Sequence, residues 1–130
     1  MAGKSSAERQ NAPELTQRAR RLRAIAGCFA EPALADTDRL IHERVRLGIM
    51  SALSVNAEMS FAALKELLQT SDGNLSRHAR KLEDAGYIAC RKTFADRLPM
   101  TRYSLTPKGR RAFARHLEHM DALIQAARGE

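Results

Sequence analysis

The sequence predicts a mainly α-helical fold with one small β-hairpin (α+β), built as a single domain with an additional helix at each end. Two observations predict it. Apolar residues recur at helical spacing through most of the chain, while residues 87–106 alternate in the manner of paired strands. The chain has 130 residues, of which 44% are apolar, so it can form the core of one domain.

The centre of the chain predicts two helices joined by a tight turn. Residues 61–69 carry apolar side chains at helical spacing, and Ser60 before them is a typical N-cap. Turn-forming residues follow at 70–74. A second helix then covers residues 72–85, with Ser71 as its N-cap. Gly86 ends it because glycine readily adopts the left-handed conformation of a helix end.

A basic hairpin follows the second helix. Residues 87–94 and 100–106 are rich in strand formers, and residues 95–99 form a polar tip between them. A short third strand is expected near residues 58–60. Two helices and a basic hairpin in this order make a winged helix-turn-helix, which we expect to occupy residues 36–106.

The N-terminal region predicts a terminal helix. Residues 1–12 are small and polar, so we expect them to be disordered. Pro13 suits the first turn of a helix, and this helix with a short link would occupy residues 13–35. One apolar stripe runs along it, and the stripe includes Leu15, Leu22 and Phe29.

A further helix leads into the central motif. It is expected to run to about Leu53 from an N-cap at Thr37 or Asp38. Its apolar surface is broad, which indicates neighbours on more than one side. It would be the first helix of the winged domain.

Residues 107–130 predict a second terminal helix, which begins at Pro107. Its apolar side chains recur at steps of three and four, and they include Phe113, Leu117, Met120 and Ile124. A monomer would leave this seam and the N-terminal stripe competing for one small core. We therefore expect the two terminal helices to form the interface of a homodimer.

The charge of the chain favours a polyanionic partner. The formal net charge is +7, and the excess lies on the first helix, the hairpin and the last helix. Nucleic acid is therefore favoured ahead of a membrane surface. The sequence has neither an apolar run long enough to span a bilayer nor an apolar signal core, so the expected location is cytoplasmic. Cys28 and Cys90 are expected to be reduced.

The outward face of the helix over residues 72–85 is the candidate DNA-reading surface. Its polar side chains are Asn74, Ser76, Arg77, Arg80 and Lys81. Asparagine pairs well with adenine and arginine with guanine in the major groove, so we expect Asn74 and Arg77 to contact base edges. Ser76 and Lys81 suit the phosphate backbone, and Arg80 suits either target. The alternative is an ordinary solvated face of mixed charge.

The hairpin is the second candidate DNA contact. Residues 94–100 form its far end, where Arg97 is the one cation. An arginine at a β tip can enter the adjacent groove or meet the phosphate backbone, so we expect Arg97 to bind double-stranded DNA. The carboxylate of Asp96 beside it would repel phosphate and reduce the benefit.

Three segments in register carry a family resemblance, and they are residues 72–78, 82–88 and 103–110. Together they resemble the small bacterial winged-helix transcriptional regulators of the MarR type, over roughly residues 37–125. The resemblance implies a homodimer that regulates transcription from a roughly palindromic operator. Members of that family often have Gly with Arg at the wing tip, where this chain has Ala95 and Asp96.

Other function classes fit the sequence less well. A winged-helix module that binds protein would have a recognition face poor in Arg and Asn, unlike this one. A metal-responsive repressor could use His116 and His119, three residues apart, but metal-sensing relatives add ligands where this chain has Ser104 and Thr106. A ligand-responsive switch would add to DNA binding and not replace it. No enzyme constellation occurs, so we predict no enzyme, no cofactor and no metal site.

Overall fold

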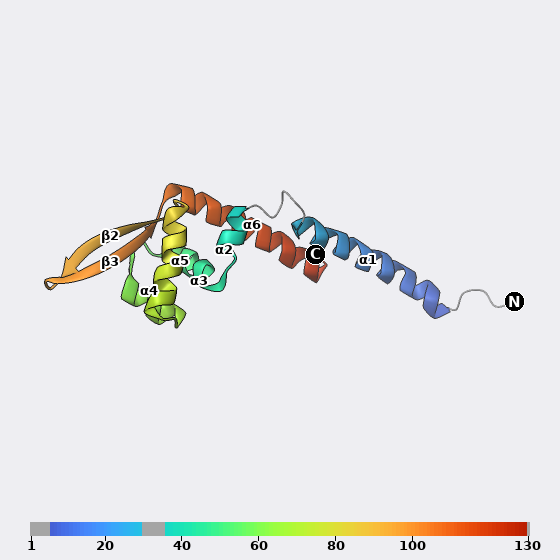
Figure 1. Ribbon diagram of the computed structural model, residues 1–130. Coiled ribbons are helices and arrows are strands. Elements are labelled where there is room, and N and C mark those ends of the chain that lie inside the picture. Colours follow the sequence, from blue (N-terminus) through green and yellow to red (C-terminus); the bar gives the residue numbers. More distant parts are fainter. Residues whose placement is uncertain (1–5, 30–35, 130) are drawn as a thin grey trace. The chain divides into compact units, whose positions relative to one another are not determined.

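The computed structural model describes residues 6–29 and 36–129. In chain order the elements are α1 (Ser6–Phe29), α2 (Asp36–Ile41), α3 (Arg44–Val55), β1 (Met59–Ser60), α4 (Phe61–Leu68), α5 (Asp72–Asp84), β2 (Ile88–Ala95), β3 (Leu98–Leu105) and α6 (Pro107–Arg128) (Figure 1). This order confirms the predicted winged helix-turn-helix with a helix at each end.

The chain divides into two compact units. Asp36–His116 form one, which we call the winged unit. Met1–Ala35 and Leu117–Glu130 form the other, which we call the terminal unit. Helix α6 contributes its first part to the winged unit and its end to the terminal unit. Within the described residues, no helix is long and apolar enough to cross a membrane.

The three strands form one antiparallel sheet in the order β1-β3-β2. Strand β1 pairs with β3 at Tyr103 and Arg102, so the expected third strand is present. Strands β2 and β3 pair along their whole length, from Ile88 opposite Leu105 to Ala95 opposite Leu98. The hairpin they form, which we call the wing, projects beyond the helices of its unit (Figure 1).

The wing turn is shorter than the sequence predicted. The expected tip covered residues 95–99, but Ala95, Leu98 and Pro99 are paired in the strands. Asp96 and Arg97 alone connect them, with φ values of 50° and 69°. Two positive φ values fit the tight turn whose twist matches that of a hairpin. Pro99 is tolerated because β1 pairs with β3 at a distant position, which leaves β3 an edge strand here.

The core of the winged unit lies between its helices and the sheet. Its largest fully buried side chains are Ile41, Val45, Ile49, Met50, Leu53, Leu64, Leu75, Leu82 and His116. Phe113 is 6% exposed and belongs to the same core. It was expected at the dimer interface, and this placement is corrected. The first turns of α6 pack on the winged unit, so the apolar seam of α6 does not serve one surface alone.

A close contact joins the base of the wing to the start of α6. A Cβ atom added to Gly109 would lie 1.9 Å from the carbonyl oxygen of Tyr87, so no larger residue fits there. The Oγ1 atom of Thr106 accepts a hydrogen bond from the N–H of Gly109 and donates one to the carbonyl of Gly86, at 2.9 and 2.6 Å. Gly86 has φ +81°, which confirms the predicted left-handed end of the second helix.

The helix expected from residue 37 to 53 is two helices in the structure. Helix α2 ends at Ile41 and α3 begins at Arg44. Glu43 between them has an extended backbone, and its carboxylate accepts a hydrogen bond from the N–H of Arg46 at 2.9 Å. Glu43 is thus an N-cap, which sequence patterning alone did not separate from an ordinary helical glutamate.

Helix α1 begins earlier than predicted. It starts at Ser6, and Pro13 lies inside it. The expected disorder over residues 1–12 is therefore wrong for residues 6–12, where alanine, glutamate, arginine and glutamine are good helix formers. Residues 1–5, and the link that was expected to end at residue 35, lie outside the described residues.

Candidate nucleic-acid interface

Helix α5 separates its residues into a buried and an outward face. The Oγ atom of Ser71 accepts a hydrogen bond from the N–H of Asn74 at 3.2 Å, which confirms the predicted N-cap. The buried side chains are Leu75, His78, Ala79 and Leu82. Four of the five predicted reading residues are exposed, namely Ser76, Arg77, Arg80 and Lys81. The helix can therefore present three cations and a hydroxyl to a ligand.

Asn74 has a different environment from the other four. Its side chain is half-buried, and its Nδ2 atom donates to Oγ1 of Thr70 at 2.8 Å. Its Oδ1 atom accepts a hydrogen bond from the guanidinium of Arg77, also at 2.8 Å. Asn74 therefore connects the turn to Arg77 and orients that guanidinium, which has further N–H donors for a ligand.

The N-terminal end of α5 carries a compensated carboxylate. Asp72 lies in the first turn, where the helix dipole favours it, but it would repel a phosphate. Lys65 of α4 lies with its Nζ atom 2.9 Å from Oδ1 of Asp72. Such an exposed pair adds little stability, but it offsets a negative charge at the end of the reading helix.

The side chain of His78 connects α5 to the junction of α2 and α3. Its Nδ1 atom lies 2.9 Å from NH1 of Arg46 and 3.5 Å from Oε2 of Glu43. A guanidinium can only donate, so Nδ1 accepts and the ring is neutral. Burial lowers the pKa of His78, and the cations Arg46, Arg77 and Lys81 lower it further, while Glu43 opposes them. The side chain of His78 is buried, with 6% of its surface exposed.

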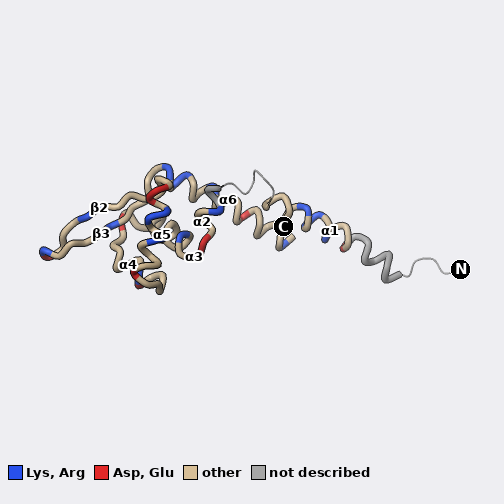
Figure 2. Tube along the Cα trace, viewed as in Figure 1, with Lys and Arg blue, Asp and Glu red and all other residues tan. Residues whose placement is uncertain are grey.

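The cations of the wing are not equivalent. Arg91 forms two hydrogen bonds with the carboxylate of Glu58, at 2.7 and 3.2 Å, and its charge is balanced. Lys92 and Arg97 are exposed, and Asp96 adjoins Arg97 in the turn. Figure 2 shows basic residues along both strands of the wing and on α5.

A hollow of about 400 Å³ lies between α5 and the wing. Helix α5 contributes Ser76, Arg80 and Glu83, and the wing contributes Cys90, Lys92, Thr101 and Tyr103. The hollow thus brings two predicted reading residues next to Lys92, which sequence reasoning did not include in the site. Alternation along the strand puts Lys92 on one face with Cys90 and Ile88, but only the fold shows that this face meets α5.

The sequence from residue 45 to 124 matches the profile of the winged helix DNA-binding domain family. The chain belongs to this family. It is a family of DNA-binding domains found in transcriptional regulators, and it is not enzymatic.

Similar proteins come from several organisms. An uncharacterized protein of Methanocaldococcus jannaschii is 33% identical over 79 residues, which are 61% of this chain and 86% of that protein. The solved structure of a transcriptional regulator homologue from Pyrococcus horikoshii is 28% identical, with a TM-score of 0.67 over 81% of this chain and 97% of the other. A MarR-family regulator from Silicibacter pomeroyi shares the fold at 23% identity and a TM-score of 0.55, over 95% and 81%.

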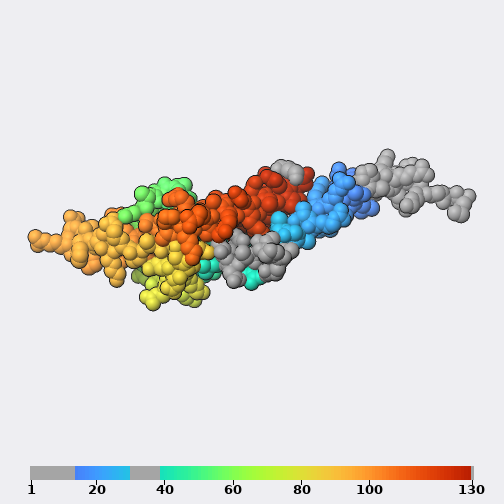
Figure 3. Space-filling view, turned by 90° about the horizontal axis from the view of Figure 1, so that it is seen from above, coloured from blue at the N-terminus to red at the C-terminus, as the bar shows by residue number. Residues whose placement is uncertain are grey.

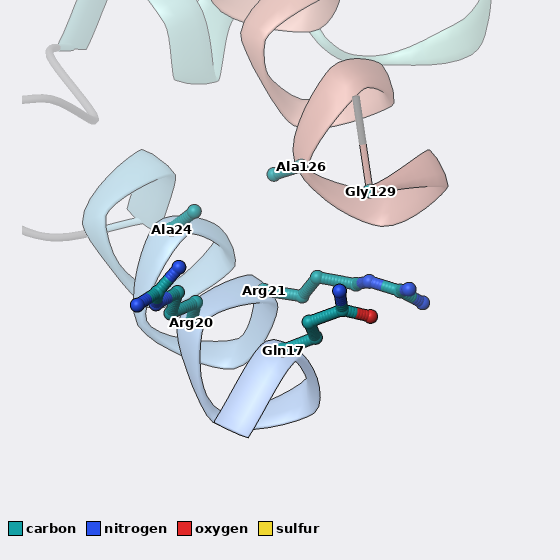
Figure 4. Close-up of a pocket in the computed structure, with 6 residues that line it drawn as sticks. All are labelled: Gln17, Arg20, Arg21, Ala24, Ala126 and Gly129. Carbon is teal, nitrogen blue, oxygen red and sulfur yellow. The ribbon is translucent and has the colours of Figure 1, made fainter. Parts of the chain in front are cut away.

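The terminal unit of this winged-helix chain pairs two antiparallel helices. The ring of Phe29 in α1 meets that of His119 in α6 edge-on, at 6.4 Å between centroids. Further along, the guanidinium of Arg21 lies against Gly129, where α6 ends. An arginine is favourable there because the last carbonyls of a helix carry partial negative charge. A hollow of about 350 Å³ lies between the helices, lined by Gln17, Arg20, Arg21, Ala24, Ala126 and Gly129 (Figure 4).

The terminal unit leaves large apolar side chains in solvent. Those from the predicted dimer interface are Leu15, Leu22, Phe29, Leu117 and Ile124, with exposures from 43% to 60%. Met120 is half-buried, and Phe113 belongs to the winged unit. Exposed apolar surfaces of this kind commonly mark interaction sites.

The two histidines of α6 have different surroundings. His116 is 1% exposed in the winged unit, and its ring centroid is 5.7 Å from that of His42. His119 belongs to the terminal unit, where it meets Phe29. The three-residue spacing therefore does not place both imidazoles at one site. Among the residues that the structure describes, no three His, Cys, Asp or Glu side chains are grouped so that they could hold a metal ion.

Proposed function

We propose that the protein is a sequence-specific DNA-binding transcriptional regulator that acts as a homodimer in the cytoplasm. Helix α5 occupies the major groove, and residues 94–100 of the wing contact the adjacent groove or the backbone. The observation that carries the proposal is the exposed basic face of α5 next to a basic wing, in a member of a DNA-binding family.

The exposed residues of α5 divide into two roles. Arg77 reads a base edge, because its guanidinium is oriented by Asn74 and can bond guanine bidentately. Ser76 and Lys81 hold the phosphate backbone. Arg80 lies in the hollow beside Lys92, which favours a phosphate between the two grooves. Asn74, which the sequence assigned to a base, acts mainly through Arg77.

The terminal helices provide the dimer. The exposed apolar side chains of α1 and of the end of α6 support this role, because a second copy would cover both sets together. A homodimer presents two copies of α5, and its operator would be a roughly palindromic pair of half-sites. Arg97 at the wing tip adds affinity that does not depend on sequence.

A gel shift on a mixed-sequence duplex separates this function from that of a protein-binding winged helix. At low salt we expect a shifted complex, and a higher salt concentration should weaken it strongly because phosphate contacts release counterions. The variant Arg80→Ala should shift less DNA than the wild type at equal salt. Absence of any shift at low salt would contradict the proposal and favour a protein partner.

A further inference from the structure

The far end of the wing carries two large apolar side chains in solvent. Phe94 is 76% exposed and Leu98 is 69% exposed, and they flank the turn of Asp96 and Arg97. Figure 3 shows this hairpin, in orange, projecting past the helices of the winged unit. Neither side chain contributes to the core of the unit. Single exposed apolar residues are common on protein surfaces. An exposed phenylalanine at the end of a basic wing is a candidate ligand contact.

The pairing register assigns the two side chains to opposite faces of the wing. Phe94 lies opposite Pro99, whereas Leu98 lies opposite Ala95. Residues directly opposite one another share a face, and faces alternate along each strand. Phe94 therefore shares its face with Lys92, which lines the hollow beside α5. Leu98 lies on the other face, away from α5.

We propose that Phe94, supported by Pro99, is an apolar wedge that enters the DNA groove adjacent to the one read by α5. There its ring packs against deoxyribose and against the edge of a base step, which it partly unstacks. This inference rests on the proposed function, and it names a contact that differs in kind from the cationic contacts of Arg80, Lys92 and Arg97.

Distance along the strand supports this placement. Phe94 lies four positions along the strand from Cys90, which lines the hollow beside α5. At about 3.3 Å per residue the ring lies about 13 Å further along the wing. The major groove is about 12 Å wide, so a wing that starts beside α5 reaches the neighbouring minor groove at this point.

Charge selects duplex DNA as the occupant. Lys92 and Arg97 lie two and three residues from Phe94 and are both exposed. Cations on both sides of an apolar ring match the phosphates on both sides of a minor groove. An apolar protein surface, or the same face of a second copy, would leave these two charges without a counterpart.

The test compares Phe94→Ala with Leu98→Ala, two truncations of exposed side chains at the same tip. Affinity is measured by fluorescence anisotropy across a salt series, on a duplex recovered from a random pool with the wild type. We expect Phe94→Ala to lose about tenfold or more in affinity with an unchanged salt slope, because the contact is apolar. Leu98→Ala should stay within about twofold, and Phe94→Leu should keep most of the affinity.

A second readout reports the wedge directly. With 2-aminopurine at successive positions of the groove beside the α5 site, wild-type protein should raise the fluorescence of one step, and Phe94→Ala should not. Equal affinity losses in Phe94→Ala and Leu98→Ala, or a loss below twofold in Phe94→Ala, would overturn the wedge. A change in the oligomeric mass of the DNA-free protein caused by Phe94→Ala would also overturn the wedge. Failure of the wild type to bind any duplex would instead overturn the proposed function.

Discussion

The two units of this chain differ in whether they bury apolar side chains in a core. In the winged unit, side chains such as Leu64 are fully buried, and polar atoms of Thr106 and His78 find partners across elements. In the terminal unit, Leu22 is 60% exposed and Leu117 is 50% exposed. The winged unit thus has a buried core of its own, although Val55, Leu67, Phe94 and Leu98 are exposed, whereas no side chain of the terminal unit that the structure describes is buried.

The difference indicates that the two units have separate roles. A winged unit with its own core can hold α5 and the wing in fixed geometry. In the homodimer proposed above, the terminal unit would set the distance between two copies of α5. Mutations in the first unit should act on folding or on DNA contacts, and mutations in the second should act on assembly.

The largest expected effect is on the folding of the winged unit. Leu64→Ala removes a fully buried side chain and should lower the free energy of unfolding by about 2–5 kcal/mol. Urea denaturation followed by circular dichroism measures it. Leu67→Ala lies one turn further along α4 but is 58% exposed, so it should change the stability by less than about 0.5 kcal/mol. Similar losses in the two variants would mean that α4 does not pack as described.

The next effect is on assembly. Leu117→Glu should raise the dimer dissociation constant at least about tenfold, because it places a charge in an apolar interface. Light scattering at micromolar concentration should give twice the chain mass for the wild type and a single chain mass for the variant, with unchanged circular dichroism. The matched control is Leu67→Glu, a similarly exposed leucine in the winged unit. A wild type that stays monomeric would defeat the assignment.

A smaller effect concerns the coupling of Asn74 to Arg77. Arg77→Ala should cost about 1–3 kcal/mol of binding free energy on the preferred duplex and relax the preference at one position. Asn74→Ala should cost part of this. The double variant should cost no more than Arg77→Ala, since both changes remove one contact. Additive losses would show that Asn74 reads DNA by itself, and an equal loss on random DNA would contradict the role of Arg77.

His78 predicts a pH dependence of folding. Its pKa in the folded chain lies below the ordinary value of 6.5, so the unfolded chain takes up this proton first as pH falls. Stability from the neutral ring is therefore present above pH 6.5 and is lost as the pH falls below it. Urea midpoints measured from pH 8 to about 5 should decline in the wild type and decline less in His78→Asn. Parallel curves would contradict the network with Arg46.

The smallest effect is at the wing turn. Arg97→Gln should flatten the slope of log affinity against log salt by about 0.9 per protomer if the guanidinium meets a phosphate. Asp96→Asn should strengthen binding, because a carboxylate near the backbone is removed. Both are measured on one duplex across a salt series. If neither variant changes affinity or slope, the turn does not meet a phosphate.

Local signals in the sequence were sufficient for most of the winged unit. The caps at Ser60 and Ser71 and the left-handed Gly86 each depend on residues within one turn, and all three were predicted. Helix spacing likewise identified the buried face of α5, because the pattern of a buried face repeats along the chain.

The features that sequence reasoning missed depend on contacts between distant residues. Phe113 continues the spacing of Leu117, but it packs in the core of the winged unit, on the part of α6 where Gly109 lies against Tyr87. The role of Asn74 depends on which of two local partners its amide takes. Lys92 joined the candidate site because the wing register turns it toward α5.

Selection of bound sequences from a random DNA pool with the wild-type chain tests the central claim most directly, which is that the winged unit reads DNA and the terminal unit pairs two readers. The predicted result is an inverted repeat whose half-sites lie about one helical turn, roughly 10 base pairs, or a multiple of it apart. Leu117→Glu should recover the same half-site without the repeat. A pool with no enriched sequence after repeated rounds would contradict the claim.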